Sequence, residues 1–478
     1  MSAKDSYNVR KSHEKVAPDG GWGYAIVIAA IINISISTMF LSSYGLLFKA
    51  FLQEIGVRPT QATLIFGVSS FSTALGGYLT SPLLRLMSLR MLTFISTLIF
   101  NAGVICILLV KSVFAFHICQ GILQGLGFGF AYNLSYTIIN DYFVKKRLMA
   151  ISLGHTAIAA INMLGPPLLK WSLNEFGFRG TVLLMSGLSL HNFISVALMQ
   201  PVDWHMKRVE LSTGSNEKLL HDKKRSEEAA IVPFIKITKP DGNLSKSGEK
   251  ISSEFKEDDV IEKGIKWIDK SLCRTFLMSC VCVGPALALF ADAMYADIFP
   301  QALHIAGWDK NNLALALSLY GVGDLVMRIL FIFLSSWLQQ FGSQELYILG
   351  VTIGLVSRLG MLWSKSRIPI LLYIVVVGTS HCAVNILIPL VVADAVPSDK
   401  FTTALGMLMM LTGLINLVIG PAIGAVRELS ESNGPAFYLI ASCFAIIVLF
   451  WSIELCYKRN KHKRLQRREY LQKKINKQ

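Results

Sequence analysis

Residues 313–337 read LALALSLYGVGDLVMRILFIFLSSW, and this stretch decides the fold. It is long enough to cross a hydrocarbon layer of roughly 30 Å as a helix, yet it contains Asp324 and Arg328. A charge at a bilayer centre costs roughly 2.5–3.5 kcal/mol, so such residues usually mark a substrate or ion path. Their spacing of four places both on one helix face. We expect a transmembrane helix that holds an arginine ready for an anion; the alternative is a structural salt bridge between helices.

The apolar pattern continues along the whole chain of 478 residues, of which 53% are hydrophobic and 16% charged. A soluble protein carries about 25% charged residues. The runs predict an all-α membrane protein with twelve transmembrane helices in two six-helix halves. The expected spans are residues 22–48, 62–84, 91–110, 113–139, 148–169, 178–199, 273–298, 312–337, 345–364, 368–394, 402–426 and 435–457.

A polar stretch separates the sixth span from the seventh. Six spans, a linker and six spans are typical of transporters built from two related halves around a central path. We therefore expect five segments. They are an N-terminal segment (1–20), a first half (21–200), a disordered linker (201–272), a second half (273–457) and a basic tail (458–478).

The net charge of +15 is unevenly distributed. Lysine and arginine collect in the N-terminal segment, the linker, the tail and the run from Lys145 to Arg147, all of which fall on one membrane face in this topology. That asymmetry follows the positive-inside rule. It predicts that both termini are cytoplasmic and argues against a nucleic-acid partner. The basic tail is expected either to contact anionic lipid headgroups or to be a solvated anchor of the topology.

The first span opens with Asp19-Gly20-Gly21-Trp22-Gly23-Tyr24. Asp19 is expected to cap the helix that follows it, and the aromatic residues suit the membrane interface. The string closely resembles the first-span signature of the monocarboxylate transporter family, within the major facilitator superfamily. The run from Asp141 to Ala150 is similar to the family's second motif, although Leu148 replaces its usual proline. The Asp324–Arg328 spacing is the third match.

The resemblance implies a twelve-helix transporter whose Asp324 and Arg328 handle protons and anions. The proton-coupled lactate carriers of the family have a lysine late in the first span, where this chain has Ser42. The surrounding residues, Tyr44 among them, are more similar to branches that carry amino acids, carnitine and related metabolites. We therefore expect a branch other than the lysine-bearing symporters.

Other polar residues within spans are weaker candidates. His381 falls near the family's selectivity position in the tenth span, and Asn385 shares its helix face. We predict that Ser42, Tyr44, His381 and Asn385 line the substrate path with the charged pair. Arg358 is expected to be structural, either extending to the membrane surface or pairing with an acidic residue of a neighbouring helix.

Glycine and proline recur near the end of the fifth helix of each half, as Gly165-Pro166-Pro167 and as Gly420-Pro421. Such residues weaken a membrane helix, and neighbouring helices must then satisfy the freed backbone groups. They predict either gating points or sites of close packing.

Together these features predict a symporter of the plasma membrane that moves a small monocarboxylate or related metabolite by alternating access. One alternative is a proton-independent facilitative carrier of an amino acid or zwitterion. Another is a non-transporting membrane receptor. We expect no enzymatic activity, cofactor or metal. The expected partners are the organic anion or zwitterion, a proton in the symport hypothesis, membrane lipid and, by resemblance, a single-span ancillary glycoprotein.

Overall fold

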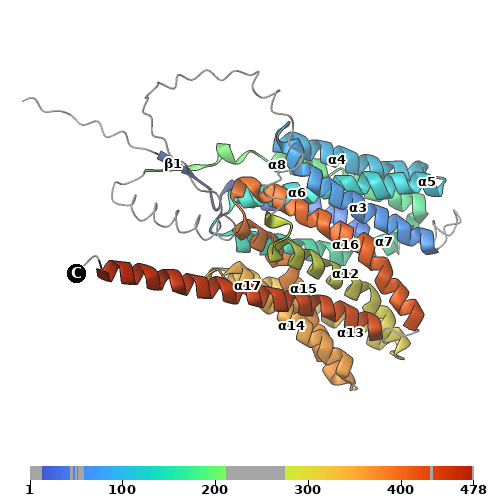
Figure 1. The fold of residues 1–478 in the computed structure, drawn as a ribbon. Helices are drawn as coiled ribbons and strands as arrows, with labels where there is room; N and C mark the ends of the chain where they lie inside the picture. Colours follow the sequence, from blue (N-terminus) through green and yellow to red (C-terminus); the bar gives the residue numbers. More distant parts are fainter. Residues whose placement is uncertain are drawn as a thin grey trace, which may run out of the picture.

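The computed structural model describes residues 13–42, 47–48, 51, 59–210, 275–364, 366–430 and 434–475. Long helices dominate these ranges (Figure 1). The N-terminal group comprises α1 (Trp22–Ser42), α3 (Pro59–Leu84), α4 (Leu89–Cys106), α5 (Val113–Phe116), a π-helix (His117–Gln124), α6 (Gly125–Tyr142), α7 (Arg147–Ser189) and α8 (Asn192–Leu198). The C-terminal group comprises α12 (Cys280–Ile305), α13 (Lys310–Leu338), α14 (Ser343–Trp363), α15 (Arg367–Ala395), α16 (Phe401–Ser430) and α17 (Gly434–Ile475).

Within the described residues, ten stretches are long and apolar enough to cross a membrane. One of them, residues 147–198, contains a break at Gly177, where a φ of 65° interrupts α7. This break falls between the fifth and sixth expected spans. The second expected span corresponds to α3, which is not among the ten. The helical architecture is therefore as expected, and the ten stretches are compatible with twelve spans.

Glycines set the spacing between α3 and α6. A Cβ on Gly125 would lie 2.7 Å from the carbonyl oxygen of Ser69, and one on Gly76 would lie 2.5 Å from that of Leu126. Only glycine permits such an approach of two backbones. The backbones of α3 and α6 are therefore in close contact at these glycines.

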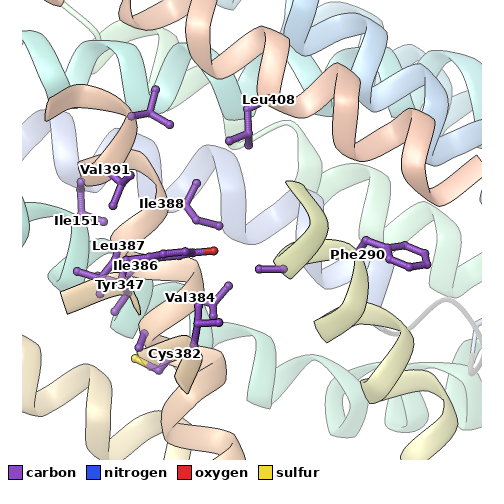
Figure 2. Packing of buried hydrophobic residues seen from close by; sticks show 14 of the residues in the cluster. Ile151, Phe290, Tyr347, Cys382, Val384, Ile386, Leu387, Ile388, Val391 and Leu408 are labelled. Carbon is purple, nitrogen blue, oxygen red and sulfur yellow. The ribbon is translucent and has the colours of Figure 1, made fainter. Parts of the chain in front are cut away.

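The two groups of helices meet where α3 packs on α16 and where α7 packs on α13. Asn133 on α6 donates its amide to the carbonyl oxygens of Gly77 (2.6 Å) and Thr402 (3.2 Å), so it joins both groups. The main core takes buried apolar side chains from α1, α6 and α7 of the N-terminal group and from α12, α13, α14, α15, α16 and α17 of the C-terminal group; Figure 2 shows part of it. Its labelled members include Ile151, Phe290, Tyr347 and Leu408.

The beginning of the predicted linker is ordered. Strand β2 (Lys207–Glu210) pairs antiparallel with β1 (His13–Val16), and a short 3-10 helix (Val202–Trp204) precedes it. The prediction that the linker is disordered is therefore wrong for residues 201–210, and residues 211–274 lie outside the described residues. At the other end of the chain, α17 continues to Ile475 through most of the expected basic tail.

Candidate functional site

The charged pair on α13 forms as its spacing predicts. Arg328 Nε donates to Asp324 Oδ2 at 2.8 Å. Arg328 Nη1 donates to the backbone carbonyl oxygen of His155 on α7, at 3.2 Å. The arginine therefore connects the C-terminal group of helices to the N-terminal group. Arg328 is only 7% exposed, and the other carboxylate oxygen of Asp324, Oδ1, has no hydrogen-bond partner in the described part of the chain.

Polar contacts continue from this pair into the N-terminal group. The hydroxyl of Tyr136 on α6 lies 2.6 Å from His155 Nε2. One turn along α6, the ring of Tyr132 packs against that of Tyr136 at 4.7 Å. Local sequence patterns gave no sign of this arrangement, because α6 and α7 bring the residues together only in the folded chain.

A second cluster lies within the C-terminal group. Arg358 on α14 donates through Nη2 to Asp292 Oδ1 on α12, at 2.6 Å. The other oxygen of Asp292 is hydrogen-bonded to His381 Nδ1 on α15. The Arg358 guanidinium also lies over the rings of Tyr295 (4.7 Å) and Phe444 (4.2 Å). Of the two alternatives for Arg358, pairing with an acidic residue is therefore the one that the structure has.

Tyr320 on α13 links the two clusters. Its ring packs against His381 with centroids 5.6 Å apart, and it lies one turn before Asp324. Asn385 Nδ2 donates to the backbone carbonyl oxygen of His381 at 2.9 Å, so the two residues share a face of α15 as expected. His381 and Asn385 thus lie beside Asp292, in the cluster adjoining the predicted pair.

The predicted residues of the first span are not part of this arrangement as described. Ser42 is the last residue of α1, and its side chain lies outside the described residues. Tyr44 lies outside them altogether. Their roles in the substrate path stay predictions.

The first-span motif has a different structural role from the one expected of Asp19. Its Oδ1 accepts hydrogen bonds from the backbone N–H groups of Val144 (2.8 Å), Lys145 (2.9 Å) and Lys146 (3.2 Å). These residues directly precede α7, so Asp19 holds the segment that leads into α7. The prediction that Asp19 caps its own helix is therefore wrong. Asp19 itself has a φ of 48°, a conformation that its short polar side chain tolerates.

The other motif residues fix the same junction. A Cβ on Gly23 would lie 2.8 Å from Phe143 Cζ, so only glycine allows this contact. The Tyr24 ring packs edge-on against Phe143 at 6.0 Å. Trp22 stacks on His205 at 5.3 Å and donates its indole N–H to the Leu198 carbonyl oxygen. The first and second motifs of the sequence therefore bind each other.

The glycine–proline positions lie within continuous helices. Pro166 and Pro167 are inside α7, after the buried Gly165, and Pro421 follows Gly420 inside α16. The break in α7 is at Gly177, ten residues beyond Pro167. A gating role for these residues stays a prediction.

Long apolar helices in two groups, with buried ion pairs inside the C-terminal group and a hydrogen bond from one of them to the N-terminal group, are typical of a secondary membrane transporter. The chain belongs to the Major Facilitator Superfamily, whose family profile matches residues 26–239 and 281–475. This membership confirms the expected fold class, and it confirms a transporter rather than an enzyme.

Curated relatives carry the family name expected from the motifs. Mouse monocarboxylate transporter 6 is 23% identical over 88% of this chain and 84% of its own length. Rat monocarboxylate transporter 1 is 24% identical over 90% and 83% respectively. Human monocarboxylate transporter 1 is 32% identical over 39% of this chain and 37% of its own. The resemblance to monocarboxylate transporters is therefore confirmed.

Solved structures share the fold. The proton:xylose symporter XylE matches with a TM-score of 0.65 and 13% identity, over 90% of this chain and 95% of its own. The transporter FucP in its outward conformation matches with a TM-score of 0.58 and 12% identity, over 90% and 98%. At these identities the likeness concerns the fold alone.

Proposed function

We propose that this protein carries a small organic monocarboxylate across the plasma membrane, with Arg328 as the cation that receives the carboxylate. The observation that carries the proposal is the bonding of Arg328, which joins Asp324 on its own helix to the His155 carbonyl in the other group. The names of the relatives support a monocarboxylate as cargo.

The geometry suggests how cargo and transport are coupled. An arginine presents a planar fork of donors that matches a carboxylate. A cargo carboxylate that takes over the Nε or Nη1 donor of Arg328 displaces Asp324 or the His155 carbonyl, because these are the groups that the two donors bond. Loss of the second contact removes one hydrogen bond between α13 and α7. Binding would thereby favour a change in the relative position of the two groups.

A proton is the proposed co-substrate. Asp324 gives up its cationic partner when the cargo takes Arg328, and the proton is proposed to bind the carboxylate that is left behind. The unpartnered Asp324 Oδ1 is the oxygen that this proton would reach. No covalent chemistry is needed for this coupling.

The proposed topology has both termini and the linker in the cytoplasm, with six-helix halves at 21–200 and 273–457. The charge distribution supports it, because the basic tail, linker and N-terminal segment then share one side. A single-span ancillary glycoprotein is proposed from the family resemblance alone. Co-expression followed by surface labelling tests it.

One observation favours the alternative cargo, an amino acid or zwitterion moved without a proton. Ser42 replaces the lysine of the proton-coupled carriers. A panel of radiolabelled lactate, pyruvate, amino acids and carnitine, tested in a heterologous cell, distinguishes the two cargoes. Failure to move any of them would support the receptor alternative.

The role of Arg328 is tested by uptake with Arg328→Gln. We expect a decrease of about 100-fold, because loss of one partner of a buried charge pair costs roughly 2–5 kcal/mol. Arg459→Gln is the matched control, since Arg459 pairs with Glu345 at an exposed position. Uptake by Arg328→Gln at the rate of the parent would overturn the central role.

Proton coupling is tested by recording cytosolic pH during uptake, in the parent and in Asp324→Asn. The parent is expected to acidify the cytosol as the cargo enters. The variant keeps an oxygen for Arg328 but has no group to titrate, so uptake should persist without acidification. Equal acidification in both would remove Asp324 from the proton path.

A further inference from the structure

A cavity of about 240 Å³ lies between the two groups of helices, apart from both ion pairs. The N-terminal group contributes α1, α3, α4, the π-helix and α6 to its lining, and the C-terminal group contributes α12, α15 and α16. Ligand pockets commonly have about 300–1,000 Å³. This one therefore suits a small metabolite or a part of one.

Two buried glutamines of the π-helix line the cavity. Gln120 and Gln124 are each 4% exposed. Gln120 Oε1 and Gln124 Nε2 have no hydrogen-bond partner among the residues that the structure describes. A buried polar atom without a partner costs roughly 1–3 kcal/mol, which a ligand able to bond it recovers. Two such atoms on neighbouring turns would therefore be stabilised by a polar group of a ligand.

The backbone that carries the two glutamines also has an unusual helix geometry. The segment His117–Gln124 is a π-helix between two α-helical stretches. Short π segments are rare within membrane or soluble helices and frequently occur at functional sites. Here the segment contains both unsatisfied glutamines, so the local irregularity and the unpaired polar atoms coincide.

The other polar residues of the lining are Ser37, Ser69, Ser70, Thr73, Tyr132, Thr412 and Asn416, which offer both donors and acceptors. The hydroxyls of Ser37, Thr73 and Thr412 donate to carbonyl oxygens of their own helices, at 3.0, 2.9 and 2.9 Å. Each hydroxyl oxygen keeps lone pairs for a donor from the cargo. Among the described residues that line the cavity, none carries a formal charge. Such a lining suits an uncharged group that both donates and accepts hydrogen bonds.

The cavity adjoins the charged clusters along three helices. Tyr132 lines the cavity and lies one turn from Tyr136, which contacts His155. Leu289 lies three residues from Asp292 on α12, and Ile388 lies three residues from Asn385 on α15. At a rise of 1.5 Å per residue, these offsets correspond to roughly 5 Å along each helix. The cavity therefore lies about one helical turn from residues of both charged clusters.

We propose that this cavity is a second subsite, which receives an uncharged hydroxyl or amide group of the cargo while Arg328 holds its carboxylate. The inference rests on the proposed function, because it takes the carboxylate position from there. It narrows the substrate class to organic acids that carry a neutral hydrogen-bonding group several bonds from the carboxylate. Plain aliphatic acids would use only half of the site.

The test compares matched acids on the purified full-length protein in nanodiscs. The probes are butyrate, 4-hydroxybutyrate and succinamate, with affinity read from the ligand-dependent increase in melting temperature. In the parent we expect the two polar acids to bind at least tenfold more tightly than butyrate. The double variant Gln120→Leu with Gln124→Leu should abolish that preference. It should leave the affinity for butyrate within about threefold of the parent, because butyrate has no group that bonds the glutamines.

Controls separate the possible failures. Gln340→Leu, at an exposed position beyond α13, should keep the preference. The melting temperature without ligand and the size-exclusion profile show whether each variant folds. If the double variant does not fold, the single variants Gln120→Asn and Gln124→Asn are tested in its place. Equal affinities for the three acids in the parent, or a preference that survives loss of both glutamines, would overturn the subsite. If Arg328→Gln bound all three acids like the parent, the proposed function would fail instead.

Discussion

The two buried ion pairs of the C-terminal group have the same chemistry and different surroundings. Arg358 and Asp292 join α14 to α12, and their side chains are 2% and 4% exposed. Arg328 and Asp324 belong to one helix, and their side chains are 8% and 14% exposed. The first pair is enclosed by aromatic rings and shared with His381. The second reaches across to the His155 carbonyl oxygen of the other group.

This difference separates stabilisation from function. A charge pair that is enclosed by its own group of helices keeps its contacts when the two groups move relative to each other. A pair that bonds across the groups loses a contact in that motion. The Asp292 cluster therefore resembles a fixed strut, and the Asp324 pair has the geometry of an exchangeable contact.

The largest expected effect follows from replacing each arginine by methionine. Arg358→Met leaves Asp292 with His381 alone in an enclosed site, and loss of a buried partner typically costs about 3–5 kcal/mol. Arg328→Met should destabilise the protein less, because Asp324 is more exposed. Melting temperatures of the purified variants measure the difference. A larger decrease for Arg328→Met would break the comparison.

A smaller effect is expected for His381→Phe. Asp292 keeps Arg358 but loses one hydrogen bond to a charged group, worth about 1.5–3 kcal/mol. The phenyl ring can still pack against Tyr320. We therefore expect a moderate decrease in melting temperature, between those of the parent and Arg358→Met. If uptake were lost while the melting temperature stayed that of the parent, His381 would belong to the transport path and the cluster would be more than a strut.

The smallest effect is expected for Tyr136→Phe. It removes one neutral hydrogen bond to the His155 ring, worth about 0.5–1.5 kcal/mol. The Arg328 contact survives, because its acceptor is the backbone of His155. Uptake should consequently decrease by no more than about tenfold. A loss as large as that of Arg328→Gln would show that the imidazole, instead of the carbonyl, couples the two groups.

The sequence predicted what is local or periodic. Twenty-residue apolar runs gave the helical membrane fold, and the spacing of four gave the Asp324–Arg328 pair, because both depend on residues within one helix. The partner of Arg358 could not be predicted from the sequence. Asp292 is 66 positions away, and only the three-dimensional packing of the helices brings the two residues together. The sequence showed acidic residues in other spans, but several of them could have paired with Arg358.

The same limit explains Asp19. Its position before α1 suggested a cap for that helix, yet its carboxylate reaches residues 125 to 127 positions away. Backbone N–H groups before α7 are equivalent to those of α1 in chemistry, so only the three-dimensional arrangement chooses between them. The cavity beside the π-helix was likewise hidden, because helices of both groups form its lining.

The hydrogen bond between Arg328 and His155 depends on the side chain of Arg328 but only on the backbone of His155. Every residue type has a backbone carbonyl, so exchanging the side chain at position 155 does not remove the acceptor. A single substitution can abolish the contact at position 328, whereas position 155 must be displaced as a piece of helix to lose it. A substitution at position 155 that leaves α7 in place therefore keeps this hydrogen bond between the two groups of helices.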